Sequence, residues 1–456
     1  MNRSLRREFF TFVFLNILGQ MAYSCYTMAD TFFVAAKLGT DGLTALNLAF
    51  PVFCLMNGLG LLVGMGGGTR YAICRSRELP EQGNRAFSCA SILAAAFSCI
   101  FLLTGIFFSR ELVRFLGADG HMFAMTHSYL QVMLLFAPAF FASNLLQCFI
   151  RNHGNPSLAT AAMITGCACN ILLDYVFVFP LDMGIFGAIL ATGLSPVISL
   201  LVMSPYLLHR KNRFHFVKPC QLTQNVQTIL SGGLPSFLSE ATSGVVMFLF
   251  NALILPLAGN VGVAAFGVVS CISLVVIAVY TGLSQGIQPL LSRYHGAKEP
   301  ENVKSVFRYA LFTAGALSLL MYGVICFGAH GITALFDREG NPILAELAVR
   351  GLRLYFLACP FVGFHLMLAT RLAATEHPVP ARWLSLMRGC LVYPGCDDYG
   401  VAVENDRRLA GISGDRVHCI SFGHFFQKAY VSNRIKRVLK FTSRSRKGHI
   451  KCDFVG

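Results

Sequence analysis

Long apolar runs recur along this chain from Phe9 onward, each long enough to cross a bilayer as a helix. A transmembrane helix needs about 20 predominantly apolar residues, and about ten runs meet that length, with the start of another near Trp383. The pattern predicts an all-α polytopic membrane protein with spans over residues 9–34, 43–69, 86–108, 125–150, 157–179, 184–208, 226–256, 262–290, 305–328 and 345–372.

The two halves of the chain resemble each other at a shift of about 220 residues, and such internal symmetry is typical of secondary transporters. Pro138 in "FAPAF" lines up with Pro360 in "LACPF", and Pro156 lines up with Pro378 at the same spacing. We therefore expect two pseudo-symmetric six-helix bundles: an N-terminal bundle over 1–208 and a C-terminal bundle over 226–390, joined by a basic connector over 209–225.

The second bundle is expected to be incomplete at its C-terminal end. From Cys390 onward no apolar window reaches spanning length, and residues 391–456 mix acidic with basic side chains. A bilayer span cannot stop halfway, because its backbone groups would be left unsatisfied in hydrocarbon. We interpret residues 391–456 as a frameshift or missense tail; the alternative is a genuine cytoplasmic domain.

The charged residues support the membrane assignment and give an orientation. They make up 13% of the chain, against about 25% in an ordinary soluble domain. The formal net charge is +15, and within the predicted membrane part the basic residues gather in alternate loops, such as 70–85, Arg151 and 209–218, while the intervening loops are mixed or nearly neutral. This positive-inside pattern predicts a multi-pass protein of the inner (plasma) membrane with a cytoplasmic N-terminus, a retained first span and no nucleic-acid partner.

No sequence motif indicates an enzyme, a metal site or a cofactor. The closely spaced pairs among the 16 cysteines, Cys167/Cys169 and Cys390/Cys396, lack the companion ligands of a zinc site. The glycine-rich "GMGGGT" over 64–69 lacks the following Lys-Ser/Thr of a phosphate loop. Its glycines are better explained by close packing of helices within the membrane.

Acidic side chains inside the predicted spans are the candidate chemistry. Asp30 lies near the end of the first span, and Asn170 and Asp174 are four residues apart, on one face of a helix. A carboxylate near the bilayer centre costs about 2.5–3.5 kcal/mol, so an intramembrane acid marks a functional site by default. The alternative is that Asp174 lies near the interface, where Pro180 and Asp182 follow, and merely hydrates a helix end.

The order of several stretches resembles the multidrug and toxic compound extrusion (MATE) family over roughly residues 5–390. The stretches are "MADTFFVAAKLGTDGLTALNLAFP", "GMGGGTRYAICR", "FIRNHGNPSLAT", "NILLDYVFVFPLDMGIFGAILAT", "GLPSFLSEATSG" and "SQGIQPLLSRYHGAKE". The resemblance implies two six-helix bundles facing each other across a central cavity. It also implies an antiporter that exports drug-like, lipophilic and cationic compounds in exchange for H⁺ or Na⁺. We expect it to act as a monomer in the lipid bilayer.

The resemblance further implies a cation site in the N-terminal bundle. In related members it is formed by an acid of the first helix, an Asn and an Asp of the fifth, and a Thr of the sixth. The matching residues here are Asp30, Asn170, Asp174 and Thr192. Oxygen ligands suit Na⁺, and a buried carboxylate pair suits one proton because burial and like charge both favour the protonated form. The coupling ion stays open between H⁺ and Na⁺.

Glu240 is the only acid inside the seventh span, where some relatives place a glutamate in the cavity wall. It lines up with Gln20 of the first half, and we expect Glu240, Gln20 and Asn251 to line the substrate cavity. The alternative for Glu240 is a purely structural role, hydrogen-bonded to neighbouring Ser and Thr. The tenth span lacks the mid-span acid of some relatives and carries a lone His365, so a second ion site in that half is not expected.

Two other functions remain open from the sequence. A lipid-linked sugar flippase of related architecture would have a strongly basic cavity, whereas here acids lie in the spans and bases in the loops. A non-functional remnant of a transporter would follow if the last helices have been lost after residue 390.

Overall fold

The computed structural model of the protein describes residues 3–118, 120–208, 215–218, 222–336 and 342–390, without the side chains of 3, 40, 121, 208, 222, 242–264, 335–336, 342–343 and 386–390. These residues form helices joined by short turns, with no strand among them. The α-helices are α1 (Arg3–Ser76), α2 (Pro80–Phe107), α3 (Ser109–Phe115), α4 (His121–Leu135), α5 (Ala137–Asn152), α6 (Pro156–Val178), α7 (Gly184–Leu208), α8 (Leu222–Gly296), α9 (Pro300–Phe336), α10 (Pro342–Tyr355), α11 (Cys359–Ala374) and α12 (Pro378–Cys390).

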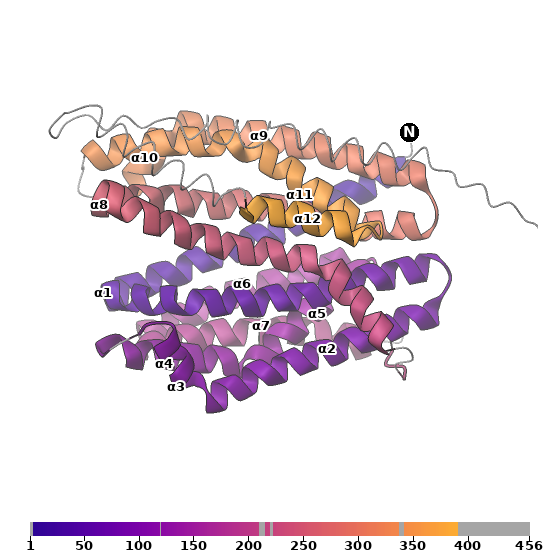
Figure 1. Cartoon of the computed structure of the whole chain (residues 1–456), viewed down its shortest axis with the longest axis horizontal. Coiled ribbons are helices and arrows are strands. Elements are labelled where there is room, and N and C mark those ends of the chain that lie inside the picture. Colours follow the sequence, from indigo (N-terminus) through magenta and orange to yellow (C-terminus); the bar gives the residue numbers. More distant parts are fainter. Residues whose placement is uncertain (1–2, 119, 209–214, 219–221, 337–341, 391–456) are drawn as a thin grey trace, which may run out of the picture.

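Two of these helices are too long to be single spans. α1 has 74 residues and α8 has 75, or about 110 Å at 1.5 Å per residue, against about 30 Å of hydrocarbon. α1 reverses at Gly39, whose φ of 65° and ψ of −145° suit glycine, and so supplies the two spans Ser4–Gly39 and Asp41–Ser76. α8 also runs as two legs, of which the second contains the span Ala265–Gly296 (Figure 1).

The predicted spans are confirmed wherever the described residues test them. Eight helices are long and apolar enough to cross a membrane, and a ninth crossing is the bent pair Met122–Leu135 and Ala137–Asn152. Residues 125–150, predicted as one span, are bent there by 48°, next to Pro138, which cannot continue the backbone hydrogen-bond ladder. The tail over 391–456, with its proposed frameshift, lies outside the described residues.

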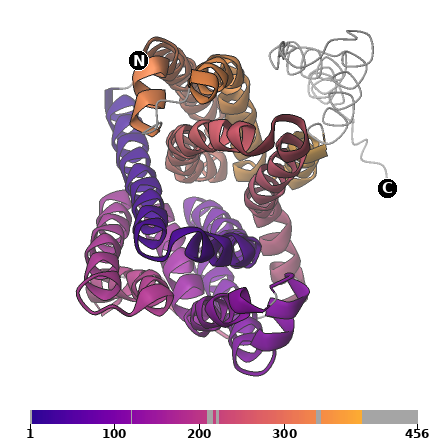
Figure 2. The same cartoon turned by 90° about the vertical axis from the view of Figure 1, so that its left-hand side faces the viewer.

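The helices form two groups that face each other (Figures 1 and 2). Helices α2–α7 lie on one side, and α9–α12 with the second leg of α8 lie on the other. The first group has one apolar core, around Met133 and Phe149, and the second has two apolar clusters, one around Ile287 and one around Leu352. This is the all-helical, two-bundle fold class expected from the sequence; the boundaries proposed for the two bundles stay predictions.

The first helix of each half begins on the opposite group. Leu5, Phe9 and Val13 of α1 are buried against Leu283 and Ile287, which belong to the second group. Correspondingly, Ile229 near the start of α8 is buried in the core of the first group, where Leu234 and Phe237 also pack. The two helix starts are thus exchanged, and together they hold the groups in contact at one end of the molecule.

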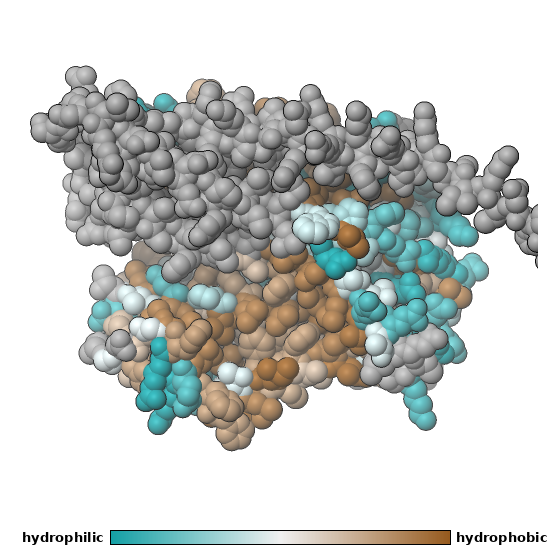
Figure 3. Space-filling model, in the orientation of Figure 1, coloured by the Kyte–Doolittle hydropathy of each residue, from teal (hydrophilic) through white to brown (hydrophobic). Residues whose placement is uncertain are grey.

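That end is also where basic residues gather, and we call it the basic end. It carries the turns over 77–79, 153–155, 297–299 and 375–377 and the connector segment 215–218. Figure 3 shows hydrophilic residues concentrated there, next to a broad apolar surface. On the outer faces large apolar side chains such as Phe312 and Phe327 are 78% and 92% exposed, as a lipid-facing surface requires. The chain is a multi-pass membrane protein.

Glycines permit the close contact between α1 and the start of α8. A Cβ atom at Gly66 would lie 2.0 Å from the backbone oxygen of Ile229, and one at Gly233 would lie 1.8 Å from that of Leu62. These are backbone contacts, so a methyl group is accommodated only if the two helices separate. The glycines of "GMGGGT" therefore serve helix packing, as the sequence indicated.

Gly66→Ala is expected to destabilise the protein by about 1–3 kcal/mol, the usual cost of overpacking. The measurement is the midpoint temperature of unfolding in detergent. Gly267→Ala is the matched control, because Gly267 lies on an exposed face of α8 with nothing within 4 Å of an added Cβ. Equal midpoints for the two variants would contradict the proposed role of the α1–α8 contact.

Candidate cation site and central cavity

The structure brings together the four residues predicted as a cation site. Asp30 lies on the first leg of α1, Asn170 and Asp174 lie on α6, and Thr192 lies on α7. All four are buried: Asn170 and Asp174 are fully inaccessible, and Asp30 and Thr192 are 7% and 5% exposed. Asp174 is therefore inside the helix group, and its alternative placement at a hydrated helix end is wrong.

Hydrogen bonds connect the four residues in a chain. The carboxyl groups of Asp30 and Asp174 lie within hydrogen-bonding reach of each other, so a single proton held by one of them can be shared with the other. With the Asn170 amide oriented to satisfy both of its ends, its nitrogen donates to Asp174 Oδ2 at 3.1 Å and its oxygen accepts from the Thr192 backbone N–H at 3.2 Å. The Asn170 side chain also lies 3.4 Å from Thr192 Oγ1.

Two oxygens of this cluster have no hydrogen-bond donor among the described residues. They are Oδ1 of Asp30 and Oδ1 of Asp174, both buried. A buried carboxylate oxygen without a partner costs free energy, and a bound proton or metal cation offsets that cost. The cluster therefore has the composition and the vacant acceptors of a site for a small monovalent cation.

Two tyrosines near the carboxyl pair were not among the residues predicted from the sequence. Tyr129 of α4 is close enough to interact electrostatically with both Asp30 and Asp174, and Tyr26 of α1 interacts with Asp30. Tyr26 precedes Asp30 by one helical turn, and that spacing is visible in the sequence. Tyr129 is about a hundred residues from Asp30, and no local pattern indicates their proximity.

No cluster of three or more His, Cys, Asp or Glu side chains suited to a transition metal occurs among the residues that the structure describes. Cys167 has a free thiol, as does Cys169; Cys390 and Cys396 carry no described side-chain geometry. The cation site instead offers carboxylate, amide and hydroxyl oxygens, the ligand types of Na⁺ and H⁺ rather than of zinc.

A cavity of about 120 Å³, lined by both polar and apolar side chains, lies between the two helix groups, and Glu240 is part of its wall. Asn57 of α1 donates to Glu240 Oε1 at 3.4 Å, and Asn144 of α5 donates to Asn57 Oδ1 at 3.1 Å. Glu240 is therefore bound by the Asn57 amide of α1, which Asn144 in turn holds, so its contacts are not confined to its own helix. The placement predicted for Glu240 agrees with this geometry.

The structure does not place the other two residues expected to line the cavity, Gln20 and Asn251, in its wall. Gln20 does not line the cavity; its side-chain nitrogen donates to Gln285 Oε1 at 3.2 Å, and Gln285 does line it. The side chain of Asn251 lies outside the described residues. His365, which the sequence left without a role, lines the cavity and hydrogen-bonds the Leu384 carbonyl through Nε2 at 2.8 Å.

Next to the cavity, the buried side chain of Arg151 joins the two helix groups. Arg151 of α5 is 5% exposed and donates to Asn16 Oδ1 at 2.8 Å and to Gln285 Oε1. Its partners are neutral, so the guanidinium is stabilised by oriented amide oxygens and not by a carboxylate. Gln288 continues the contact by donating to Thr69 Oγ1 at 2.7 Å. The charge pattern of the sequence predicts Arg151 in a basic loop, and that prediction is wrong because the side chain is buried.

Closer to the basic end, a single carboxylate binds three groups from different elements. Glu376, in the turn after α11, lies 2.6 Å from the Arg77 guanidinium, 3.2 Å from that of Arg70 and 3.3 Å from His295 Nε2. These hydrogen bonds, that from His295 above all, outweigh partial burial and lower the pKa of Glu376 to about 2. The ionised carboxylate therefore links α1 with the turn after α11 and the end of α8.

Comparison with known proteins assigns the chain to a family. The family model MatE matches residues 16–176 and again 235–391, together more than half of the chain. Among curated proteins, the multidrug export protein MepA of Staphylococcus saprophyticus is 23% identical over 382 residues, and MepA of Staphylococcus aureus strain NCTC 8325 is 24% identical. Both alignments cover 83% of this chain and 83% of the relative.

Solved structures share the fold at low sequence identity. A crystal structure of MATE in complex with MaL6 has a TM-score of 0.85, with 21% identity and 98% of each chain covered. An outward-facing conformation of a multidrug resistance MATE family transporter has a TM-score of 0.83, with 21% identity over 97% of this chain and 96% of the other. From the double match of the family model, the chain belongs to the MatE family, the transporters that its sequence motifs resemble.

Proposed function

We propose that this protein exports lipophilic, cationic, drug-like compounds across the inner membrane, in exchange for inward movement of H⁺ or Na⁺. The observation that carries the proposal is the buried pair Asp30 and Asp174, within hydrogen-bonding reach of each other and with one unpartnered oxygen each. The MepA relatives, which are multidrug export proteins, support the substrate class. We further propose that the protein works as a monomer with the basic end, and hence the N-terminus, in the cytoplasm.

The first leg of α1 carries both a residue of the cation site and residues of the contact between the two helix groups. Asp30 lies on this leg, and so do Gln20 and Asn16, which contact Gln285 and Arg151 at the interface. A ligand shifts a conformational equilibrium only if it binds the two states with different affinity. Cation binding at Asp30 that moves α1 would change the interface contacts on the same rigid helix, and so favour one facing state.

The energy source is sufficient for export against a gradient. One positive charge moving inward across 100 mV releases about 2.3 kcal/mol, equivalent to about a fiftyfold concentration ratio of a neutral substrate. Export of a singly charged cation in exchange for one H⁺ or Na⁺ moves no net charge, so that exchange is driven by the concentration gradient of the coupling ion, at about 1.4 kcal/mol for each tenfold difference. A carboxylate such as Glu240 in the cavity wall suits a cationic substrate. Aromatic side chains exposed on the outer surface, such as Phe312 and Phe327, attract lipophilic cations through their ring faces.

The flippase alternative is less well supported. A carrier of a lipid-linked, phosphate-bearing sugar would need a basic cavity, because phosphate is bound by Arg and Lys. Of the described residues that line the central cavity, none is Lys or Arg, and Glu240 is acidic. The remnant alternative depends on residues after 390, which lie outside the described part of the chain.

Everted membrane vesicles test the proposal. A fluorescent lipophilic cation should enter vesicles whose interior is acidic, or Na⁺-rich, faster than vesicles without the gradient. Collapsing the pH gradient with an ionophore, with Na⁺ held equal on both sides, tells which ion is coupled. Uptake that is insensitive to both gradients in a correctly inserted protein would overturn the proposal.

A further inference from the structure

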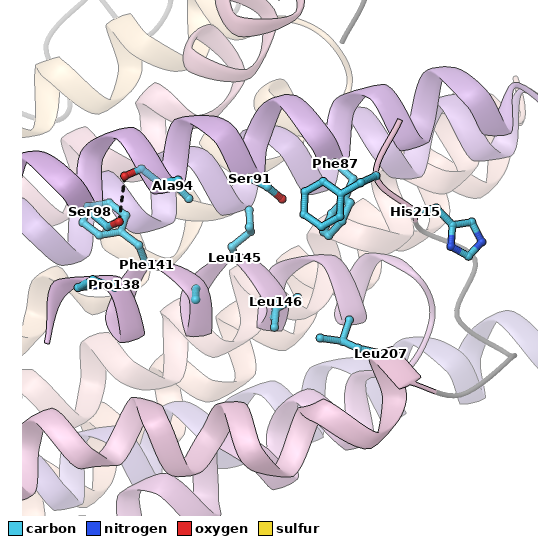
Figure 4. A pocket seen from close by; sticks show the side chains of 13 residues that line it. Phe87, Ser91, Ala94, Ser98, Pro138, Phe141, Leu145, Leu146, Leu207 and His215 are labelled. Atoms are coloured by element: carbon cyan, nitrogen blue, oxygen red, sulfur yellow. Dashed lines mark hydrogen bonds between the residues drawn. The ribbon is translucent and has the colours of Figure 1, made fainter. Parts of the chain in front are cut away.

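An apolar groove, which shares no lining residue with the central cavity, runs along the outer surface between α2 and α5 (Figure 4). Its volume is about 570 Å³, and it is larger than the central cavity. Small side chains, among them Ala94, Ala95 and Ala142, leave the space open between the aromatic rings of Phe87 and Phe141. Ala95 and Pro138 are exposed, so the groove opens to the surroundings of the helix group.

The groove has the chemistry and the length of a site for one hydrocarbon chain. Its lining is apolar apart from two serines and His215, and the Ser98 hydroxyl already donates to the Ala95 carbonyl at 2.9 Å. From Phe87 to Ser98 the helix rises about 16 Å at 1.5 Å per residue. That is about half of a 30 Å hydrocarbon core, the depth of one leaflet.

The connector closes the groove at the basic end. The His215 backbone N–H donates to Asn84 Oδ1 at 3.3 Å, and the Val217 N–H donates to Ser88 Oγ at 2.8 Å. The ring of Phe216 packs on that of Phe87 with centroids 5.2 Å apart. The segment over 215–218 is therefore fixed across the mouth of the groove by α2.

Positive charge lies at this mouth. Lys218 and His215 are exposed on the connector, and Arg85 follows Asn84 on α2. The Arg85 Nε is buried without a partner among the described residues, and only its terminal nitrogen contacts Glu81, at 3.4 Å. One helical turn inward from Phe87, the Ser91 hydroxyl also has no partner in the described chain. An anionic group at the mouth would complement Arg85, Lys218 and His215.

We propose that this groove binds one acyl chain of an anionic phospholipid from the leaflet at the basic end. The phosphate lies at Arg85, His215 and Lys218, the ester region reaches Ser91, and the acyl chain lies between Phe87 and Ser98. The bound lipid ties the connector to α2 and so stabilises the joint between the two halves. This binding does not depend on the proposed transport function.

The test is the thermal stability of the purified, delipidated full chain with added phosphatidylglycerol or phosphatidylcholine of identical acyl chains. Phosphatidylglycerol is expected to raise the midpoint temperature more than phosphatidylcholine. Ala95→Phe fills the groove and should abolish this rise. Ala96→Phe, on the adjacent exposed residue that does not line the groove, should keep it.

The headgroup contact is tested separately. Lys218→Gln and Arg85→Gln should each weaken phosphatidylglycerol binding about fivefold, since a basic residue near a membrane surface contributes about that factor. Lys298→Gln, an exposed lysine of the turn after α8, is the control. If phosphatidylglycerol still stabilises Ala95→Phe as it does the wild type, the acyl chain does not bind in the groove. If the two lipids stabilise the wild type equally, the site does not select an anionic headgroup. Protection by a lipophilic cation but by neither lipid would reassign the groove to substrate entry.

Discussion

Replacing Asp174 by Asn is expected to abolish ion-driven efflux while leaving the folded protein in the membrane. The amide has nearly the same shape, but it does not take up and release a proton near neutral pH and carries no charge to attract Na⁺. It also removes one partner of the carboxyl pair with Asp30. Coupling free energies of about 1–3 kcal/mol correspond to about 5- to 150-fold, and the initial rate of gradient-driven dye uptake should fall within or beyond that range.

The matched control is Asp182→Asn. Asp182 lies eight residues further along, in the turn after α6, where its side chain is 74% exposed and pairs with Lys37 at 2.8 Å. An exposed ion pair contributes about 1 kcal/mol or less, so this variant should keep its transport rate. Asp30→Asn should reproduce the loss, and the double variant should be no worse than either single one, because both carboxyl groups serve one site. Wild-type transport by Asp174→Asn at equal membrane levels would refute the ion site.

The sequence was sufficient for the parts of this site that follow a local rule. Asn170 and Asp174 are one helical turn apart, so their common face was predictable from spacing alone. Asp30 attracted attention because a carboxylate in an apolar run is costly. Thr192 was predictable only through the family resemblance, since a threonine in an apolar helix has no such cost.

Long-range contacts explain what the sequence did not show. Arg151 was read as a loop residue because a basic residue at the end of a span normally faces water. Its burial depends on Asn16 and Gln285, each more than a hundred residues away. The exchange of the two helix starts was equally hidden, because helices that are apolar all round give no pattern that selects a neighbour. Only Gly66 and its glycine-rich neighbours indicated where two helices meet closely.

Neutralising the carboxylate that joins the two groups at the basic end is expected to open that end. In Glu376→Gln the side chain at 376 is neutral and no longer forms ion pairs with Arg70, Arg77 and His295. The closed state, in which the two groups touch at the basic end, is then destabilised relative to an open one. The carboxylate is about one-third exposed, so screening keeps the total to about 1 kcal/mol, or about fivefold in the population of the open state.

Cys74 reports the opening. It is 2% exposed near this carboxylate, so alkylation by a maleimide requires the basic end to separate. The rate of modification of Cys74, identified by peptide mass spectrometry to separate it from the other cysteines, should rise about fivefold in Glu376→Gln. Glu81→Gln is the control at the same end, because Glu81 pairs only with Arg85 of its own helix and is 80% exposed.

The same carboxylate sets a pH dependence of the closure. Its pKa is lowered from an ordinary value of 4.5 to about 2 in the closed structure, because hydrogen bonds from His295 and Arg77 favour the ionised form. A lowered pKa stabilises the closed state fully above pH 4.5, and that contribution is lost as the pH falls toward 2. The contribution of Glu376 to the closed state should therefore stay constant between pH 5 and 7. Below pH 4.5 the closed population should decrease in the wild type but not in Glu376→Gln. Because maleimide reacts slowly with thiols in acid, the low-pH comparison uses a disulfide reagent that remains reactive there, such as a dipyridyl disulfide. Equal reactivity of Cys74 in both proteins at pH 7 and at pH 3 would show that Glu376 does not hold the basic end closed.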